Sequence, residues 1–391
     1  MHFARTLVVH RSFWLAVGLW LAGFAAVGQA QHLVIGLDNK IDFTDAGQQV
    51  PRPPGTDAVV IVDITHREQP RIVGTLPLMN SLLGPPTNLA VAPDERVALV
   101  ANSVEWVEDG GTWKPVPDNK LFVIDLQVSP PTLVETVTVG KQPSGMAINK
   151  AGTLVLIAHR ADSSVTVATL KGTQVKVVNT ITFPAGDEAA AVAITPDSQH
   201  ALVARYKARK LAVLDIDGET VTYNKQDLPA GLLPYNVQIT PDGHLAMATA
   251  GTSDGHVDVM PVYDLTATPW RVIDWVVVGD GPEGFTISPT GKLAVPVLIN
   301  GSAAAKNAWY YHKGALAVLA IDGKKVTRVG EVEVGRLPEG VAFSPEGDYL
   351  YVANDLDDDL WTFKVEGTTL TRVGQALKLP GHPASMRSRV P

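Results

Sequence analysis

The sequence predicts an all-β fold, a seven-bladed β-propeller of four-stranded blades, on three observations. A short stretch recurs six times, with starts 57, 46, 45, 48 and 56 residues apart. Each copy contains two apolar strands joined by a turn, and the sequence between copies supplies two further strands. The 3.6-residue apolar period of helical repeats is absent. Four short strands in each repeat of this length are typical of propeller blades.

The clearest copy of the repeat is PEGVAFSPEGDYLYVAN, residues 338–354. Residues 341–343 form an apolar strand, residues 344–347 form a turn, and residues 349–353 form the second strand. Proline pre-sets φ for the second position of a type I turn, and glycine accepts the conformation that follows, which explains Pro345 and Gly347. The other copies begin at Pro86, Pro143, Ala189, Pro234 and Pro282.

The two ends of the chain each supply part of one further blade. Residues 32–41, 57–64 and 70–77 read as three strands without an innermost partner. A seventh copy begins at Pro383, directly after His382 and 45 residues after the start of the sixth, and offers an innermost strand around Ala384 to Val390. Pairing these segments closes the ring and covers two sheet edges that would otherwise favour aggregation.

The first thirty residues form a separate block. Arg5 and Arg11 precede an apolar run from Phe13 to Val27, and Gly28-Gln29-Ala30 follows it. This order is typical of a secretory signal peptide cleaved after Ala30, leaving residues 31–391 as the propeller. A membrane anchor is the alternative, but the run is shorter than the usual span of ~20 residues. We therefore expect a periplasmic or secreted protein with no transmembrane segment after signal removal.

Composition narrows the possible chemistry. Cysteine is absent from the chain, which excludes thiol catalysis, cysteine metal sites and disulfides. The chain without residues 1–30 carries 30 basic and 40 acidic residues, a formal charge of −10. This balance argues against nucleic acid as the partner, because such binding depends mainly on cationic contacts to phosphates.

The repeat resembles that of a known family. With DYLYVAN at Asp348 to Asn354 and strands such as KLFVIDL, the chain is similar to the YVTN-type (YncE-like) seven-bladed propellers, close to the lactonase-like propeller superfamily. The resemblance covers nearly all of residues 31–391. It implies a seven-bladed ring in an exported protein. Because such families include binding proteins, lactonases, cycloisomerases and electron-transfer subunits, the resemblance leaves the activity open.

In a propeller, the loops before the innermost strands and the loops after the second strands share one face, around the mouth of the channel. Long loops are expected at residues 42–57, 102–120 and 300–313, rising over one half of that mouth. Loops on a rigid scaffold are where binding residues concentrate, and aromatic side chains suit planar or sugar-like ligands. The candidate ligand-binding residues are Asn88, Arg160, Arg205, Tyr235, Asn236, Trp106, Trp309, Tyr310, His312 and His382. Alternatively, the aromatic residues only pin the loops to the blades.

Charged residues on this face suggest two kinds of site. Arg160 and Arg205 are placed to grip a carboxylate or phosphate by two-point hydrogen bonds, unless they pair with acids of the same rim. The oxygen ligands of a hard cation such as Ca²⁺ are expected from Glu188, Asn236, Glu283 and Glu339. The alternative is that these acids cap backbone amides. If the protein is catalytic, Glu188, Glu283, Glu339 or His159 is the candidate general acid or base.

Two functional hypotheses follow. The first is a non-catalytic binding or scaffold protein of the cell envelope, holding a small anionic ligand, an envelope polymer or a protein partner at the channel mouth. It rests on the absence of a recognisable catalytic constellation in the sequence. The alternative is a lactonase-like hydrolase acting at the same face, with Ca²⁺ or another divalent cation as a candidate cofactor.

Overall fold

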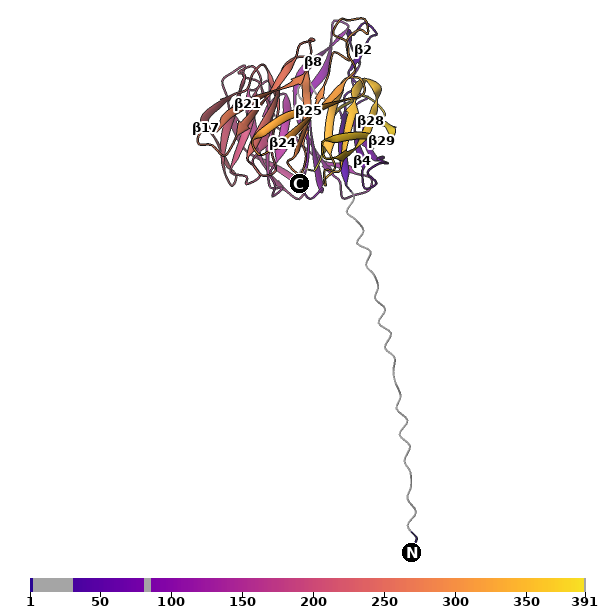
Figure 1. Cartoon of the computed structure of the whole chain (residues 1–391), viewed down its shortest axis with the longest axis vertical. Helices are drawn as coiled ribbons and strands as arrows, with labels where there is room; N and C mark the ends of the chain where they lie inside the picture. The colour runs from indigo at the N-terminus through magenta and orange to yellow at the C-terminus, as the bar shows by residue number, and fades with distance from the viewer. Residues whose placement is uncertain (3–30, 81–85, 390–391) are drawn as a thin grey trace.

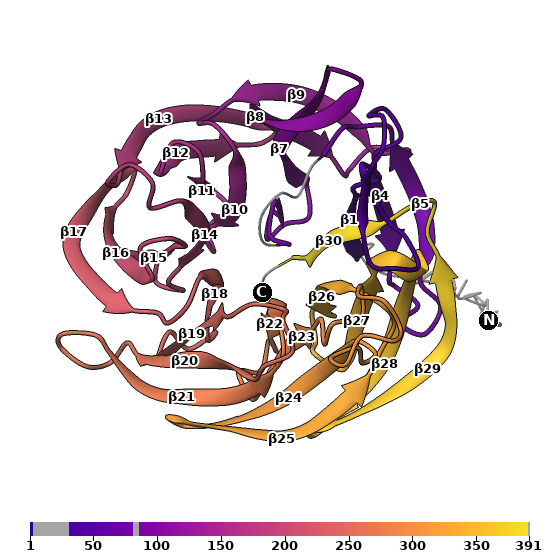
Figure 2. The same cartoon turned by 90° about the horizontal axis from the view of Figure 1, so that it is seen from above.

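The computed structural model describes residues 1–2, 31–80 and 86–389, and in it seven four-stranded antiparallel sheets surround a central channel (Figure 2). The predicted all-β, seven-bladed fold is confirmed. Residues 3–30, which make up nearly all of the predicted signal peptide, lie outside the described residues, so that feature stays a prediction. Within the described ranges, no helix is both long enough and apolar enough to cross a lipid bilayer.

Six blades are continuous in sequence, and their strands follow one another from the channel outward. Blades two to four consist of β6 (Leu89–Val91), β7 (Val97–Asp109), β8 (Thr112–Asp125) and β9 (Thr132–Thr138); β10 (Pro143–Ile148), β11 (Leu154–His159), β12 (Ser164–Lys171) and β13 (Gln174–Thr182); and β14 (Ala189–Ile194), β15 (His200–Arg205), β16 (Lys210–Asp217) and β17 (Thr220–Pro229). Blades five to seven consist of β18 (Pro234–Ile239), β19 (Leu245–Ala250), β20 (Asp258–Asp264) and β21 (Arg271–Gly279); β22 (Pro282–Ile287), β23 (Leu293–Leu298), β24 (Ala315–Asp322) and β25 (Lys325–Glu333); and β26 (Pro338–Phe343), β27 (Tyr349–Asn354), the 3₁₀ turn η1 (Asp355–Asp357), β28 (Asp359–Glu366) and β29 (Thr369–Lys378).

Blade one is built from both ends of the chain. Its order is β30-β1-β4-β5, with β30 (Pro383–Ser388) innermost, followed by β1 (His32–Leu37), β4 (Ala58–Asp63) and β5 (Arg71–Leu76). The antiparallel register places Ile35 opposite Met386 and Leu33 opposite Ser388. Figure 2 shows β30 beside β1 at the inner edge of this blade. The predicted pairing of the two termini is therefore confirmed.

The hydrophobic core lies between the blades. Seven clusters of buried apolar residues can be traced, and each joins two neighbouring blades. One of them packs Ile35 and Met386 of blade one against Tyr351 of blade seven. Inner strands such as β1 and β23 are buried on both faces, which explains their nearly continuous apolar sequences. Each fully buried aliphatic side chain contributes about 1.5–3 kcal/mol, so the ring is stabilised mainly by contacts between blades.

The repeated proline–glycine turns gather on one face of the ring, which we call the turn face. The amide of Gly347 donates to the carbonyl oxygen of Ser344 at 2.9 Å, and φ of Gly347 is 78°, a value that favours glycine. The open side of this glycine faces Pro289 in the turn of the preceding blade. The same contact joins Pro93 to Gly152, Pro196 to Gly243 and Pro241 to Gly291. Both residues of the motif therefore serve the packing of successive turns.

The opposite face carries the long insertions, and two of them differ from the sequence-based expectation. Residues 102–120, expected as a loop, continue β7 and β8 as a paired hairpin. Its tip is Gly110-Gly111, where both residues have positive φ, as tight hairpin turns require. Residues 42–57 contain a smaller hairpin of β2 (Ile41–Phe43) and β3 (Gln49–Pro51).

The three insertions lie together, as predicted. Strand β3 contacts β8, and Gly47 at the tip of the β2–β3 hairpin packs on Ala304 of the 300–313 segment. Figure 1 shows β2 raised above the ring on this face. The base of the hairpin is fixed by Lys40, a fully buried lysine that pairs with Asp57 and, at 2.8 Å, with Asp38. Breaking such a buried pair costs about 3–5 kcal/mol, so the hairpin is held firmly.

Candidate functional site

Backbone hydrogen bonds bring the two expected loop sets together on the face opposite the turns, which we call the insertion face. In five blades, the carbonyl oxygen of the residue before the innermost strand accepts from the amide that follows the second strand. The bonds are Gln142 to Arg160, Glu188 to Tyr206, Gly281 to Ile299, Leu337 to Asp355 and His382 to Asp38, each 2.9–3.0 Å long. Side chains from both loop sets therefore meet at one mouth of the channel.

Two glutamates from neighbouring blades form the centre of the site. Glu283 is the second residue of β22 and Glu339 the second residue of β26, and a hydrogen bond joins their carboxyl groups. A side chain at Gly284 would overlap the carbonyl oxygen of Glu339, so glycine at this position lets the two strands approach. Because β22 and β26 both begin with Pro-Glu-Gly, each contributes one glutamate, and the glycine of β22 lets the two carboxyl groups meet.

The pKa values of the two carboxyl groups are raised to different extents. Burial raises the pKa of both, and the pKa of Glu339 is raised further by the negative charges of Glu283 and Asp355. The hydrogen bond that Glu339 donates to Glu283 lowers the pKa of Glu283 and keeps its rise smaller. The pKa of Glu339 is therefore raised further than that of Glu283. Two carboxyl groups that share one proton are a recurrent arrangement for general acid–base chemistry.

Two tyrosines extend the site from blades four and five. The rings of Tyr206 and Tyr235 lie 5.7 Å apart between centroids, and the Arg160 guanidinium lies 4.7 Å from the centroid of Tyr206. Burial, together with the charge of Glu283, raises the pKa of both tyrosines. Their hydroxyls consequently stay protonated at neutral pH and are hydrogen-bond donors.

Arg160 and Glu188 form an ion pair at the edge of this group, with Nη2 and Oε2 2.9 Å apart. Glu188 has φ of 55°, a left-handed conformation that is uncommon outside glycine. Its backbone amide donates to Ser163 Oγ at 3.1 Å. The pairing of a rim acid with Arg160 is the alternative that the sequence left open. Arg160 thus lies at the edge of the site beside the tyrosine rings, with its positive charge paired to Glu188.

A further titratable group, Asp355, lies near enough to Glu339 for its negative charge to raise the pKa of that residue. Asp355 is 7% exposed, and burial raises its pKa to about 7. His382 Nδ1 lies 2.8 Å from Asp358 Oδ1 and 3.2 Å from the carbonyl oxygen of Asp355. Although burial alone would lower the pKa of His382, the charges of Asp355 and Asp358 raise it. The acidic loop of blade seven therefore neighbours the glutamate pair and holds its own histidine.

The structure separates other predicted residues from this group. Arg205 is directed to Asp187 at 2.9 Å and to Asp227 at 2.7 Å, so its guanidinium is committed to two carboxylates. His159 is completely buried, Nδ1 lies 3.0 Å from Ser164 Oγ, and burial lowers its pKa to about 4, which makes it a neutral histidine. Asn88 is also buried, and its side-chain amide donates to the carbonyl oxygen of Ala101 at 3.0 Å.

The aromatic candidates divide into two kinds. Trp106 is 9% exposed on the long hairpin and packs as a core residue. Trp309, by contrast, is 81% exposed and meets Tyr310 edge to face, with ring centroids 5.3 Å apart. His312 is exposed on the same segment. Tyr206 was not among the residues predicted from the sequence. It directly follows β15, as Arg160 directly follows β11, and this shared position after the second strand could have identified it as a site residue.

The four oxygen-bearing residues expected to bind Ca²⁺ have different surroundings. Glu188 pairs with Arg160, Glu283 pairs with Glu339, and the side-chain amide nitrogen of Asn236 is buried without a hydrogen-bond partner among the described residues. In the described part of the chain, no group of three or more His, Asp or Glu side chains is arranged so that it could hold a metal ion. A hard cation at this mouth therefore stays a proposal, with Glu339 Oε2 as a buried oxygen without a hydrogen bond to accept.

Comparison with known proteins defines the fold. No protein-family model and no curated protein matches the sequence. Among solved structures, a proposed 6-phosphogluconolactonase from Bacteroides fragilis is similar with a TM-score of 0.70 at 16% identity, covering 93% of this chain and 99% of that one. The periplasmic gluconolactonase PpgL of Pseudomonas aeruginosa is similar with a TM-score of 0.64 at 19% identity, covering 93% and 100%.

A functionally unknown protein from Desulfotomaculum acetoxidans is similar to the same degree, with a TM-score of 0.68 at 14% identity, covering 93% of this chain and all of that one. At these identities the likeness concerns the seven-bladed fold. The chain is thus a seven-bladed β-propeller whose structural neighbours include proteins described as lactonases and a propeller of unknown function.

Proposed function

We propose that the protein is a hydrolase that opens small lactones at the insertion face, using the Glu283–Glu339 pair. The observation that carries this proposal is the meeting of two half-buried carboxyl groups, both with raised pKa values, beside tyrosines whose pKa values are also raised. Lactone hydrolysis needs a base to activate water and an acid to protonate the leaving oxygen, and a carboxyl pair supplies both. The two structural neighbours described as lactonases support the same reading.

The reaction balances with these residues alone. Glu283 takes a proton from water, whose oxygen attacks the lactone carbonyl carbon. The ester carbon–oxygen bond breaks, and Glu339 gives its proton to the departing ring oxygen, which leaves a hydroxy acid. The proton on Glu283 then returns to Glu339 and restores the starting pair. The hydroxyl of Tyr235 is the donor for the developing negative charge on the carbonyl oxygen, because its pKa is raised and it keeps its proton.

The test is a lactone-hydrolysis screen with matched variants. Glu283→Gln removes the base and is expected to lower kcat by about 100-fold or more. Glu331→Gln, on the exposed outer strand β25, carries the same chemical change and should leave kcat unaltered. Each assay is run with and without a chelator, which tests the proposed divalent cation independently. The proposal fails if no lactone is turned over or if Glu283→Gln retains the parent rate.

A non-catalytic binding role at the same face is the second candidate, favoured by the exposure of Trp309 beside Tyr310. Exposed aromatic pairs on insertions suit stacking against a sugar polymer or a protein partner. Under this candidate, Trp309→Ala weakens ligand binding, whereas Glu283→Gln leaves it unchanged. The two candidates therefore predict opposite rankings for the same pair of variants.

A further inference from the structure

The channel contains a cavity whose lining extends to the turns of the turn face. It encloses about 370 Å³ and is walled by residues of the innermost strands of all seven blades. Near its mouth the wall is apolar, with one isoleucine from each of four consecutive blades: Ile148, Ile194, Ile239 and Ile287. Pockets of about 300–1,000 Å³ with apolar walls and a few placed polar groups are typical small-molecule sites. Neither Glu283 nor Glu339 lines this cavity.

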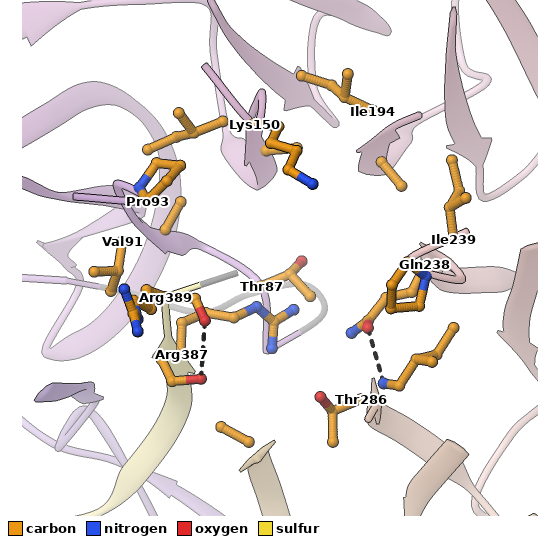
Figure 3. Close-up of a pocket in the computed structure, with 18 of the residues that line it drawn as sticks. Thr87, Val91, Pro93, Lys150, Ile194, Gln238, Ile239, Thr286, Arg387 and Arg389 are labelled. Atoms are coloured by element: carbon orange, nitrogen blue, oxygen red, sulfur yellow. Dashed lines mark hydrogen bonds between the residues drawn. The ribbon is translucent and has the colours of Figure 1, made fainter. Parts of the chain in front are cut away.

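One cation interrupts an otherwise neutral ring inside the cavity. The fifth residue of the repeat is small or neutral in six blades, namely Ala90, Ala147, Ala193, Gln238, Thr286 and Ala342. In blade one the same position is Arg387. Figure 3 shows its side chain extending into the middle of the cavity, with Lys150 directed inward from across it. The small residues leave open the space in front of the guanidinium.

This guanidinium has no acidic partner in the described part of the chain. Arg387 Nη1 donates at 3.1 Å to the carbonyl oxygen of the adjacent Met386, and the described lining residues include no Asp or Glu. Burial lowers the pKa of Arg387 to about 10, so the group is still charged at neutral pH. The neighbouring Arg389, by contrast, lies 3.2 Å from Glu95. A buried cation without a partner is costly, and an anion in the cavity would offset that cost.

Two further donors on the cavity wall lack partners among the described residues. Thr87 is 3% exposed and Asn236 is 1% exposed, and neither Thr87 Oγ1 nor Asn236 Nδ2 makes a hydrogen bond. Gln238 is different, because its side-chain amide bridges the main chain of blade six, donating to Phe285 O and accepting from Ile287 N at 3.2 Å. Unpaired buried donors are uncommon and point to a ligand or ordered water at this place.

We propose that this cavity binds a small organic carboxylate with an apolar body. Arg387 grips the carboxylate by two-point hydrogen bonding, which planar guanidinium groups favour. The apolar body lies against the isoleucine ring toward the turn face, and Lys150 attracts the anion at the mouth. The inference is independent of the lactonase proposal, because it concerns another part of the channel and is measured by binding alone.

The test uses octanoate as the probe in isothermal titration of the full propeller, with octan-1-ol as a neutral analogue of similar length. Octanoate is expected to bind with 1:1 stoichiometry and the alcohol at least about tenfold more weakly, because charge-assisted bonds are lost. Arg387→Gln is expected to weaken octanoate by about 10- to 100-fold. Glu283→Gln should bind octanoate as the parent does, which separates this site from the proposed catalytic pair.

A surface pair of variants keeps the test decisive if Arg387→Gln does not fold. Lys150→Glu reverses a charge at the cavity mouth and should weaken octanoate by about three- to tenfold. Lys292→Glu makes the same change in the equivalent turn of blade six, outside the cavity lining, and should have no effect. Equal affinity for octanoate and octanol, or unchanged octanoate affinity in both Arg387→Gln and Lys150→Glu, would overturn the proposal.

Discussion

Single titratable residues at the insertion face make the stability of this protein depend on pH. Asp355 is the clearest case, because burial raises its pKa from 3.8 to about 7, while Asp38, Asp42, Asp358 and His382 surround it. Between about pH 4 and 7, the folded protein keeps a proton on Asp355 that the unfolded chain has released. The free energy of unfolding contributed by this group therefore falls as the pH rises through that window, and the loss is complete above about pH 7.

Asp355→Asn removes this titration and is expected to flatten the decline of stability between pH 5 and pH 8. From the size of the pKa shift, the free energy of unfolding should fall by about 2–4 kcal/mol more in the parent than in Asp355→Asn across this window. Chemical unfolding monitored at several pH values measures it. Asp45→Asn, an exposed aspartate on the β2–β3 hairpin, makes the same charge change and should leave the slope as in the parent. Parallel profiles for the parent and Asp355→Asn would contradict the assignment.

At the scale of elements, the close approach of neighbouring innermost strands places the glutamate pair. Gly284 of β22 faces the backbone of Glu339 in β26, and Gly145 of β10 faces the backbone of Ala191 in β14 in the same way. Any side chain at these positions would meet main-chain atoms, which cannot move without shifting a strand. The glycine of Pro-Glu-Gly is thus a condition for the hydrogen bond between Glu283 and Glu339.

Gly284→Ala is expected to destabilise the protein by roughly 2–4 kcal/mol, because the added methyl group forces β22 away from β26. It should also lower lactone turnover, since the glutamates separate. Thermal and denaturant unfolding measure the first effect. Gly330→Ala on the outer strand β25 is the matched control: its nearest neighbour would be 3.9 Å away, so we expect a change within about 0.5 kcal/mol. Equal effects of both substitutions would refute the steric argument.

For the whole molecule, closure of the ring depends on a single short strand. Strand β30 fills the inner edge of blade one, and its Met386 belongs to the cluster between blades one and seven. Without it, β1 would be an exposed inner edge and the contacts of Met386 would be lost. Blade one would then no longer pack against blade seven along its inner strand.

Deleting residues 383–391 is expected to lower the melting temperature by at least about 10 °C, because both edge pairing and buried apolar contacts disappear. Differential scanning calorimetry measures the change. Deleting only residues 390–391 leaves β30 intact and should alter the melting temperature by no more than a few degrees. A melting temperature unaffected by the longer deletion would show that β30 is dispensable for closure.

Much of the fold was predictable because each repeat carries its turn and strand signals within a few neighbouring residues. Pro345 and Gly347 mark a turn, the alternating residues 349–353 mark a strand, and the spacing of the copies counts the blades. The long hairpin of β7 and β8 was expected as a loop, and Pro115 and Pro117 within residues 102–120 are residues that weaken a strand signal. Pairing across the hairpin, with Trp106 opposite Pro115, accommodates these prolines in a two-stranded extension.

The candidate site was predictable only as a set of residues on one face. The sequence placed Glu188, Glu283 and Glu339 where innermost strands begin, on one face of the ring, but it did not show which of them would meet. Partner choice depends on side-chain reach and strand spacing: Gly284 lets Glu283 approach Glu339, while Arg160 takes Glu188. The cavity on the turn face was not anticipated at all. Its signal was present in the fifth position of the repeat, where arginine replaces the small or neutral residues of the other six copies.

The sequence by itself determined the seven blades, their four strands and the pairing of the two chain ends, because turns and strand alternation are encoded over a few neighbouring residues. Tertiary structure alone decided which carboxyl groups from different blades meet, which side chains form an ion pair and which enclose the cavity. These contacts join residues of different repeats, and whether they form depends on distances of a few tenths of an ångström between strands. Such distances are set by the packing of the whole ring and cannot be inferred from the sequence of any one repeat.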